Sequence, residues 1–238
     1  MDNAGYVSMS RQSGLLRELD TIANNIANIN TTGFRRESTL FAEYVKNLDD
    51  GDPSLSIATM DRRYVDFSEG EIRGTDSPLD FAIRGEGFFL VEGEEEPRLT
   101  RAGSFSLNTN GELVTVDGRR VLDEGGGALV IPPQAKDISV TPDGVISADG
   151  QAVGKLGVVT ADVSTLEREG DNLYRAPEGY EPSKTSKVRQ GALEGSNVSA
   201  VTEIAHLIEV QRTYEMGQKF LESDDSRISN TIRELGQR

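Results

Sequence analysis

The two ends of the chain carry apolar side chains at the spacing of helices that pack on other helices. Near the N-terminus five apolar positions alternate by four and three residues: Leu15, Leu19, Ile22, Ile26 and Ile29. Such a helix is marginal in water unless a partner covers its stripe. The pattern therefore predicts a packed helix within residues 1–35. We expect Thr32 and Gly33 to end it, because glycine readily takes the left-handed conformation at a helix C-terminus.

The other end, residues 195–238, mirrors this pattern. Apolar side chains recur every seven residues at Leu207, Tyr214, Leu221, Ile228 and Leu235, with Ile204 and Ile232 on the partner positions and Ile208 in a second strip. The remaining partner positions, Gln211, Gln218 and Asp225, are polar, so we expect this helix to present one wet face. Pairing of the two ends is the simplest way to bury both stripes. Two helices that only cap one globular core are the alternative.

The asparagines beside the first stripe are unusual, because Asn is a weak helix former that competes for backbone hydrogen bonds. They indicate either fraying before Gly33 or amide hydrogen bonds to neighbouring subunits. With them, the candidate assembly interface consists of Leu15, Leu19, Ile22, Asn25, Ile26, Asn28, Ile29, Ile204, Leu207, Ile208, Gln211, Tyr214, Gln218, Leu221, Ile228, Ile232 and Leu235.

Between the ends the pattern changes to period two with tight turns. Asn110-Gly111 and Asp143-Gly144 each lie between short apolar runs, which is typical of β-hairpins. We therefore predict an α+β fold, with discontinuous terminal coiled-coil helices and a central antiparallel β-rich domain. Residues 1–35 and 195–238 would form the paired helices, residues 36–80 an extended connector, and residues 81–194 the β-rich outer domain.

Charge and composition exclude several classes of function. Residues 1–46 are neutral overall and residues 198–238 carry −2, so the middle of the chain carries −13 of the total −15. This balance argues against nucleic acid, whose phosphates require a basic surface. No stretch approaches the roughly 18 apolar residues of a membrane span, so we expect no membrane insertion. Without a secretory signal at the start, we expect a cytoplasmic protein or export without signal cleavage.

Individual motifs give no site of chemistry. Gly85-Glu86-Gly87 lacks the third glycine and the following helix of a dinucleotide site. The single histidine, His206, excludes two-histidine metal sites and is expected to be an ordinary helix-surface or interface residue. We predict no catalytic, cofactor-binding or metal-binding residues and therefore no enzyme.

Several longer motifs resemble the bacterial flagellar rod and hook protein family. The N-terminal residues include NNIAN (Asn24 to Asn28) and TTGF (Thr31 to Phe34), and the C-terminal match is EGSNVSAVTEIAHLIEVQRTYEMGQKFL (Glu194 to Leu221). FAIRGEGFF (Phe81 to Phe89) and TRAGSFSL (Thr100 to Leu107) are similar to the central β domain of that family.

The resemblance implies a non-catalytic subunit of the basal-body rod that crosses the periplasm. It implies export by the flagellar type III machinery and assembly, through the terminal helices, with copies of itself and with related proximal and distal rod subunits. The MDNAGYV opening and the short length most resemble proximal rod subunits. Distal rod subunits are the close alternative, the longer hook proteins come third, and a secreted binding module dimerised by its helices is a rival of another class.

Overall fold

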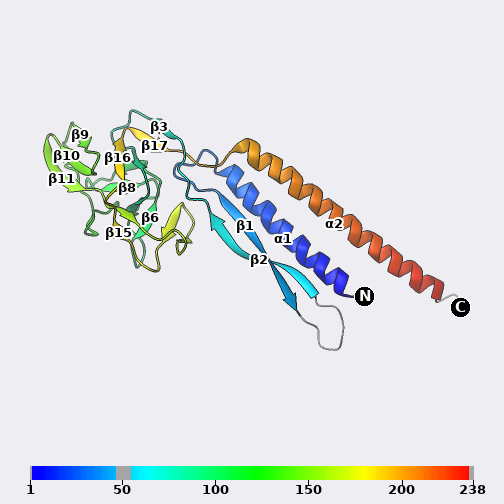
Figure 1. Ribbon diagram of the computed structural model, residues 1–238. Coiled ribbons are helices and arrows are strands. Elements are labelled where there is room, and N and C mark those ends of the chain that lie inside the picture. Colours follow the sequence, from blue (N-terminus) through cyan, green and yellow to red (C-terminus); the bar gives the residue numbers. More distant parts are fainter. Residues whose placement is uncertain (1, 47–54, 236–238) are drawn as a thin grey trace. The chain divides into compact units, whose positions relative to one another are not determined.

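The computed structural model describes the backbone of residues 2–46 and 55–235, and side chains in these ranges except those of residues 2–6, 41–46 and 55–62 (Figure 1). The chain divides into two compact units. The helical unit comprises Met1–Ala27, Arg36–Asp66 and Val198–Arg238. The β unit comprises Asn28–Arg35 and Phe67–Asn197.

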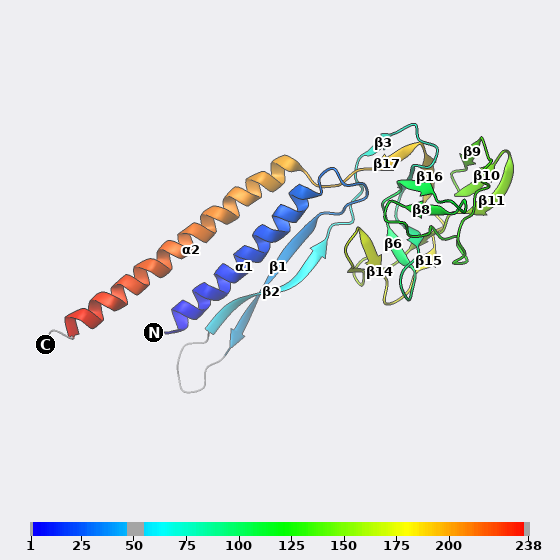
Figure 2. The same ribbon diagram turned by 180° about the vertical axis from the view of Figure 1, so that it is seen from behind.

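The helical unit contains helices α1 (Asp2–Ala27) and α2 (Ala200–Leu235) and the antiparallel strands β1 (Glu37–Lys46) and β2 (Leu55–Val65). Helix α1 contacts α2 and both strands. Figures 1 and 2 show α2 on one side of α1 and the hairpin on the other. Because two elements cover α1, side chains on more than one of its faces are buried. Within the helical unit, α1 and α2 are therefore in direct contact.

Residues 36–80 differ from the extended connector that the sequence predicted. Most of the described part of this segment is the β1–β2 hairpin, which belongs to the helical unit. The strands are rich in residues such as Leu, Ile, Val, Thr and Tyr, and strong strand formers on both sides of a turn-rich segment favour a hairpin over a linker. Residues 47–54, between the strands, lie outside the described residues.

The β unit consists of short antiparallel strands. Its largest sheet has six strands in the order β13-β14-β6-β5-β12-β15, and a second sheet has the order β11-β10-β9. The pairs β16-β4, β17-β3 and β7-β8 complete it. The bounds are β3 (Ile72–Gly74), β4 (Phe81–Arg84), β5 (Phe88–Val91), β6 (Arg98–Thr100), β7 (Phe105–Leu107), β8 (Leu113–Thr115), β9 (Ile138–Val140), β10 (Val145–Ala148), β11 (Gln151–Lys155), β12 (Val158–Thr160), β13 (Glu167–Arg168), β14 (Leu173–Arg175), β15 (Glu181–Pro182), β16 (Lys187–Gln190) and β17 (Ala192–Glu194).

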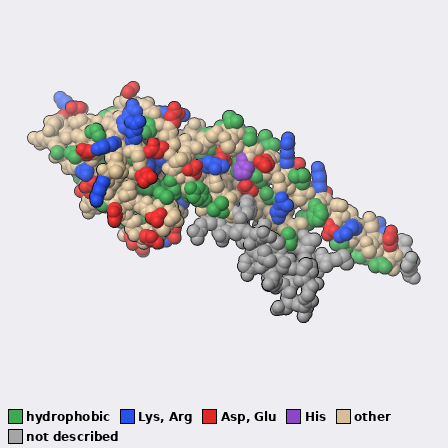
Figure 3. Space-filling model, viewed as in Figure 1, with side chains coloured by type: hydrophobic (Ala, Val, Ile, Leu, Met, Phe, Trp, Pro, Cys, Tyr) green, Lys and Arg blue, Asp and Glu red, His purple; other side chains and the backbone are tan. Residues whose placement is uncertain are grey.

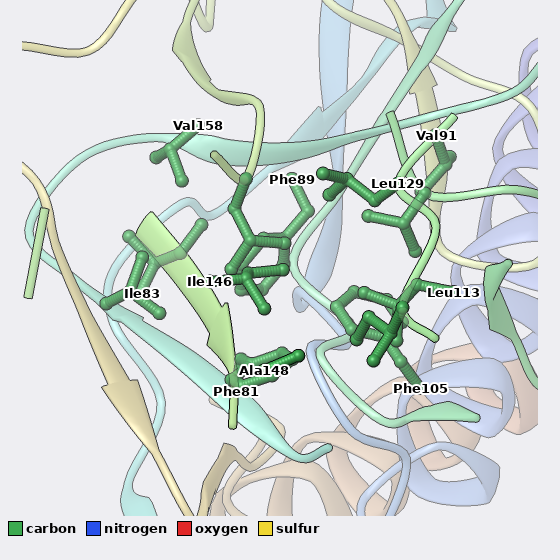
Figure 4. Close-up of a cluster of buried hydrophobic side chains, with 14 of the residues drawn as sticks. Phe81, Ile83, Phe89, Val91, Phe105, Leu113, Leu129, Ile146, Ala148 and Val158 are labelled. Carbon is green, nitrogen blue, oxygen red and sulfur yellow. The ribbon is translucent and has the colours of Figure 1, made fainter. Parts of the chain in front are cut away.

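One apolar core holds these strands together (Figure 4). The ring centroids of Phe89 and Phe105 lie 5.3 Å apart, nearly edge to face, and aliphatic side chains from β8, β10 and β12 surround them. Both predicted hairpins are confirmed, as β7-β8 and β9-β10. Gly111 and Gly144 have positive φ angles of 79° and 85° in their turns. The two helices and the central antiparallel region confirm the α+β class, whereas the coiled-coil geometry stays a prediction.

The β unit is closed by strands from its two ends. Strand β3 pairs with β17, and β4 pairs with β16. Two backbone hydrogen bonds extend this closure, from Gly33 N to Glu194 O at 2.8 Å and from Gly195 N to Glu71 O at 2.9 Å. The chain segments that lead to the two helices therefore lie side by side at one edge of the β unit.

Candidate assembly interface

The face of α2 that packs on α1 follows a heptad of its own. Glu203 and Val210 are buried, and Leu207, Tyr214 and Leu221 are partly buried. Residues late in α1 contact residues early in α2, and residues early in α1 contact later ones. Asn25 donates a hydrogen bond to Glu203, and the Gln12 side chain donates to the Tyr214 carbonyl oxygen at 3.0 Å. The helices are therefore antiparallel. The apolar side chains spaced by seven residues, Leu207, Tyr214 and Leu221, lie along the seam of contact between them.

A buried polar cluster fixes the register at one end of this seam. The Glu203 carboxylate is completely buried and accepts hydrogen bonds from Asn25 Nδ2 at 3.2 Å and from Arg36 Nε. The same Asn25 amide donates to the Glu37 carbonyl oxygen at 2.8 Å, and its oxygen accepts from Glu37 N at 2.9 Å. A slip of either helix would leave these groups desolvated and unpaired. The cluster therefore joins α1, α2 and the start of β1.

The predicted interface residues separate into several environments. Ile22 and Asn25 are buried inside the helical unit, and Leu15, Leu19 and Ile26 are partly buried. The partner positions Ile204, Gln211, Gln218 and Ile232 are exposed or partly exposed, as are Ile208 and Asp225. Ile228 and Leu235 continue the heptad but are also exposed. Burial within one chain does not test contact with another subunit, so this set stays a proposed interface.

The end of the first helix differs from the prediction. Helix α1 ends at Ala27, so Asn28 and Ile29 lie beyond it, in the β unit. A turn follows, in which Thr31 N donates to Asn28 O at 3.1 Å. Gly33 does have a positive φ of 69°, but it serves a close approach rather than a helix cap. A Cβ atom there would lie 2.4 Å from the carbonyl carbon of Arg101.

Next to Gly33, a second buried ionic cluster closes the β unit. Glu194, which is 1% exposed, accepts from Arg35 Nη2 at 2.6 Å, from Arg101 Nη1 at 3.1 Å and from Gly70 N at 2.9 Å. Burial lowers the pKa of the Arg101 guanidinium from its usual value, and the Glu194 carboxylate opposes this effect. The cluster fixes the segments before and after the β unit.

Sequence patterns missed the polar residues of both clusters. Glu203, Arg36 and Glu194 look like ordinary surface charges, and only their partners distant in sequence make them structural. Val210 was missed because the positions seven residues before and after it are Glu203 and Gly217, which break the apolar pattern. His206 lies on α2 facing α1, where its Nε2 is 3.1 Å from Glu18 Oε1.

Exposed apolar side chains remain on the helical unit (green in Figure 3). Val201, Ile204 and Ile208 form one strip at the start of α2 and are 82%, 48% and 44% exposed. Met216 and Phe220 are exposed on a different flank, 63% and 54%, beside a groove between the helices. Such side chains on one slender unit are typical of a surface that another protein covers.

The described ranges contain neither a membrane-spanning helix nor a cluster of metal ligands. Neither α1 nor α2 contains a stretch long and apolar enough to cross a lipid bilayer. Within the same ranges, no three His, Asp or Glu side chains gather so that they could hold a metal ion. The features that stand out are therefore the helix pair and its exposed apolar side chains.

Three segments of the chain match described protein families. Residues 6–35 match the flagella basal body rod protein family, residues 82–148 the flagellar hook protein FlgE/F/G D1 domain, and residues 189–234 the flagellar basal body rod FlgEFG protein C-terminal domain. Over 244 residues the chain is 41% identical to the flagellar basal-body rod protein FlgF of Caulobacter vibrioides, with 99% of each chain covered. The chain belongs to the flagellar basal-body rod protein family.

Other relatives place the chain among the rod proteins as well. It is 34% identical to FlgF of Mesorhizobium japonicum, with 99% of each chain covered. It is also 31% identical to the basal-body rod protein FlgG of Bacillus subtilis, over 95% of this chain and 97% of that one. The rod protein resemblance seen in the sequence motifs is thus confirmed, FlgF-like with FlgG as a close relative. Rod proteins are structural parts of the basal body, so the chain is not an enzyme.

Proposed function

We propose that this chain is a proximal rod subunit that leaves the cytoplasm through the flagellar type III apparatus and polymerises through its terminal helices. The observation that carries the proposal is the exposed apolar strip of Val201, Ile204 and Ile208 on a helix whose other face is already packed. Each such side chain buried at assembly contributes on the order of 1–3 kcal/mol. Partners would be copies of the chain and related rod subunits.

The charge distribution supports the same arrangement. The two terminal segments are nearly neutral, whereas the middle of the chain carries most of the negative charge. Neutral segments can be crowded around an axis with little repulsion, while solvent and salt screen the acidic segments that stay outside. A head-to-tail contact that does not close on itself then gives a helical polymer.

An aspartate in the exposed strip tests the assembly role. Ile204→Asp should remove the chain from purified basal bodies and abolish swimming, because the interface would desolvate the new charge. The side chain is already 48% exposed, so the circular dichroism of the isolated protein should stay unchanged. Thr202→Asp, on another exposed face of the same helix, is the matched control and should still assemble. Normal swimming with Ile204→Asp would contradict the proposed strip.

Export is tested separately from assembly. The chain should reach the outside of the inner membrane only in cells with a working flagellar type III apparatus. Its presence there in cells without that apparatus would contradict the proposed route.

A distal rod subunit is the second candidate, because FlgG proteins match almost the full chain. Complementation separates the two. A strain without its FlgF should swim again when it receives this chain, whereas a strain without its FlgG should not. The opposite result would favour the distal position.

A further inference from the structure

The last ten residues of α2 have no helix opposite them in the described chain. Cross-helix contacts pair Asn25 with Glu203 and Gln12 with Tyr214. Both helices rise by the same distance per residue, so each step toward the start of α1 corresponds to one step toward the end of α2. The start of α1 therefore lies opposite roughly residue 225 of α2. Figures 1 and 2 both show α2 running past the start of α1. We call residues 226–235 the overhang.

The overhang continues the stripe that packs on α1. Leu207, Tyr214 and Leu221 are partly covered, and the next two members of the same heptad are Ile228 and Leu235. On the overhang the exposed fractions rise to 38% for Ile228, 65% for Ile232 and 70% for Leu235. Burial of an apolar stripe that extends beyond its partner helix would stabilise this end of α2.

A groove between α1 and α2 offers a matching surface. It has a volume of about 340 Å³, and its apolar walls include Leu15, Met216 and Phe220. Gly217 opens it, since a Cβ atom there would lie 2.1 Å from the Gln12 amide nitrogen. Within the described chain no donor reaches the buried Gln12 Oε1 oxygen. The apolar walls favour an occupant that presents apolar side chains.

We propose that the groove holds the overhang of a second copy of this chain, a contact that rests on the proposed assembly role. The overhang supplies such side chains, because Ile228, Ile232 and Leu235 form an exposed apolar stripe that α1 does not cover. The middle of the groove near Met216 and the middle of the overhang are about 15 residues apart, so the copies would be displaced by roughly 22 Å along the helix axis. One copy then contributes the overhang and the next contributes the groove, which does not close and can repeat.

Cysteine pairs test this contact directly, because the chain contains no cysteine. In the double variant Met216→Cys/Ile232→Cys the two positions are about 24 Å apart along one helix, too far for a disulfide within one chain. Mild oxidation of purified basal bodies, and of the concentrated protein, should therefore give disulfide-linked dimers and longer ladders. The matched control is Met216→Cys/Asn230→Cys, since Asn230 is exposed on the opposite face of the overhang. It should give several-fold less product.

Each outcome decides between the two levels of the proposal. Equal linkage in both double variants, or none in basal bodies that contain the variant, overturns the groove contact and leaves the assembly role intact. Absence of the wild-type chain from basal bodies overturns the assembly role itself. A second pair, Phe220→Cys/Leu235→Cys, is 15 residues or about 22 Å apart along the helix, which equals the proposed displacement, so it should link like the first. If the first variant fails to enter basal bodies, the second pair serves in its place. Linkage of the second pair supports the groove contact, and its absence overturns that contact.

Discussion

Replacing Glu194 with glutamine tests the buried ionic cluster of the β unit. The carboxylate is nearly inaccessible and sits between the Arg35 and Arg101 guanidinium groups, at 2.6 and 3.1 Å. Glutamine keeps the shape but removes the charge, so two buried cations would face each other. One amide oxygen can still accept from Arg35 and Gly70, whereas the amide nitrogen would point a donor at Arg101.

The expected loss follows from the cost of breaking a buried ion pair. Removing one partner of such a pair costs about 3–5 kcal/mol, because the remaining charge has no water to solvate it. With a dependence on urea of about 2 kcal/mol per molar, the unfolding midpoint should fall by roughly 2 M. Tyrosine fluorescence is a suitable probe, because Tyr174 is buried in the β unit and the chain has no tryptophan.

Glu167→Gln is the matched control. Glu167 also pairs with an arginine, Arg175, but both side chains are largely exposed, at 56% and 42%. Water and salt already screen this pair, so its loss should leave the midpoint unchanged within error. If Glu194→Gln lowers the midpoint no more than Glu167→Gln, the buried cluster does not hold the β unit closed and the reasoning is refuted.

Two further predictions concern the same region and the helical unit. Gly33→Ala should lower the free energy of unfolding clearly more than Gly118→Ala does. Both alanines would carry the left-handed strain of about 1–2 kcal/mol, but only at Gly33 would the Cβ atom lie 2.4 Å from another backbone segment. Equal losses in urea titrations would contradict the close approach. Glu203→Ala should cost about 1–3 kcal/mol in the helical unit, because the buried Asn25 amide and the partly buried Arg36 guanidinium lose their acceptor. Circular dichroism at elevated temperature should show earlier loss of helix. Glu209→Ala, exposed on the same helix, should behave as wild type.

Much of the fold can be predicted from local patterns. The terminal helices follow from apolar spacing, and the hairpins follow from Asn110-Gly111 and Asp143-Gly144, since these signals depend on neighbours in sequence. The β1–β2 hairpin was predicted as a linker, because its turn-rich centre outweighed the strand-forming residues on either side. The end of α1 was placed too late, because Gly33 signals a left-handed residue but not the purpose it serves.

The sequence by itself determined that two amphipathic helices flank an antiparallel β region, and its motifs determined the family. Only the tertiary structure decided which face of α2 is covered by α1 and which is left exposed. The physical reason is that burial of Glu203 and close approach at Gly217 depend on Asn25, Arg36 and Gln12, which lie more than 150 residues away in sequence. The periodicity of neighbouring residues carries no information about contacts between residues so distant in sequence. Antiparallel packing in three dimensions also sets the length of the overhang, and with it the surface proposed for the next subunit.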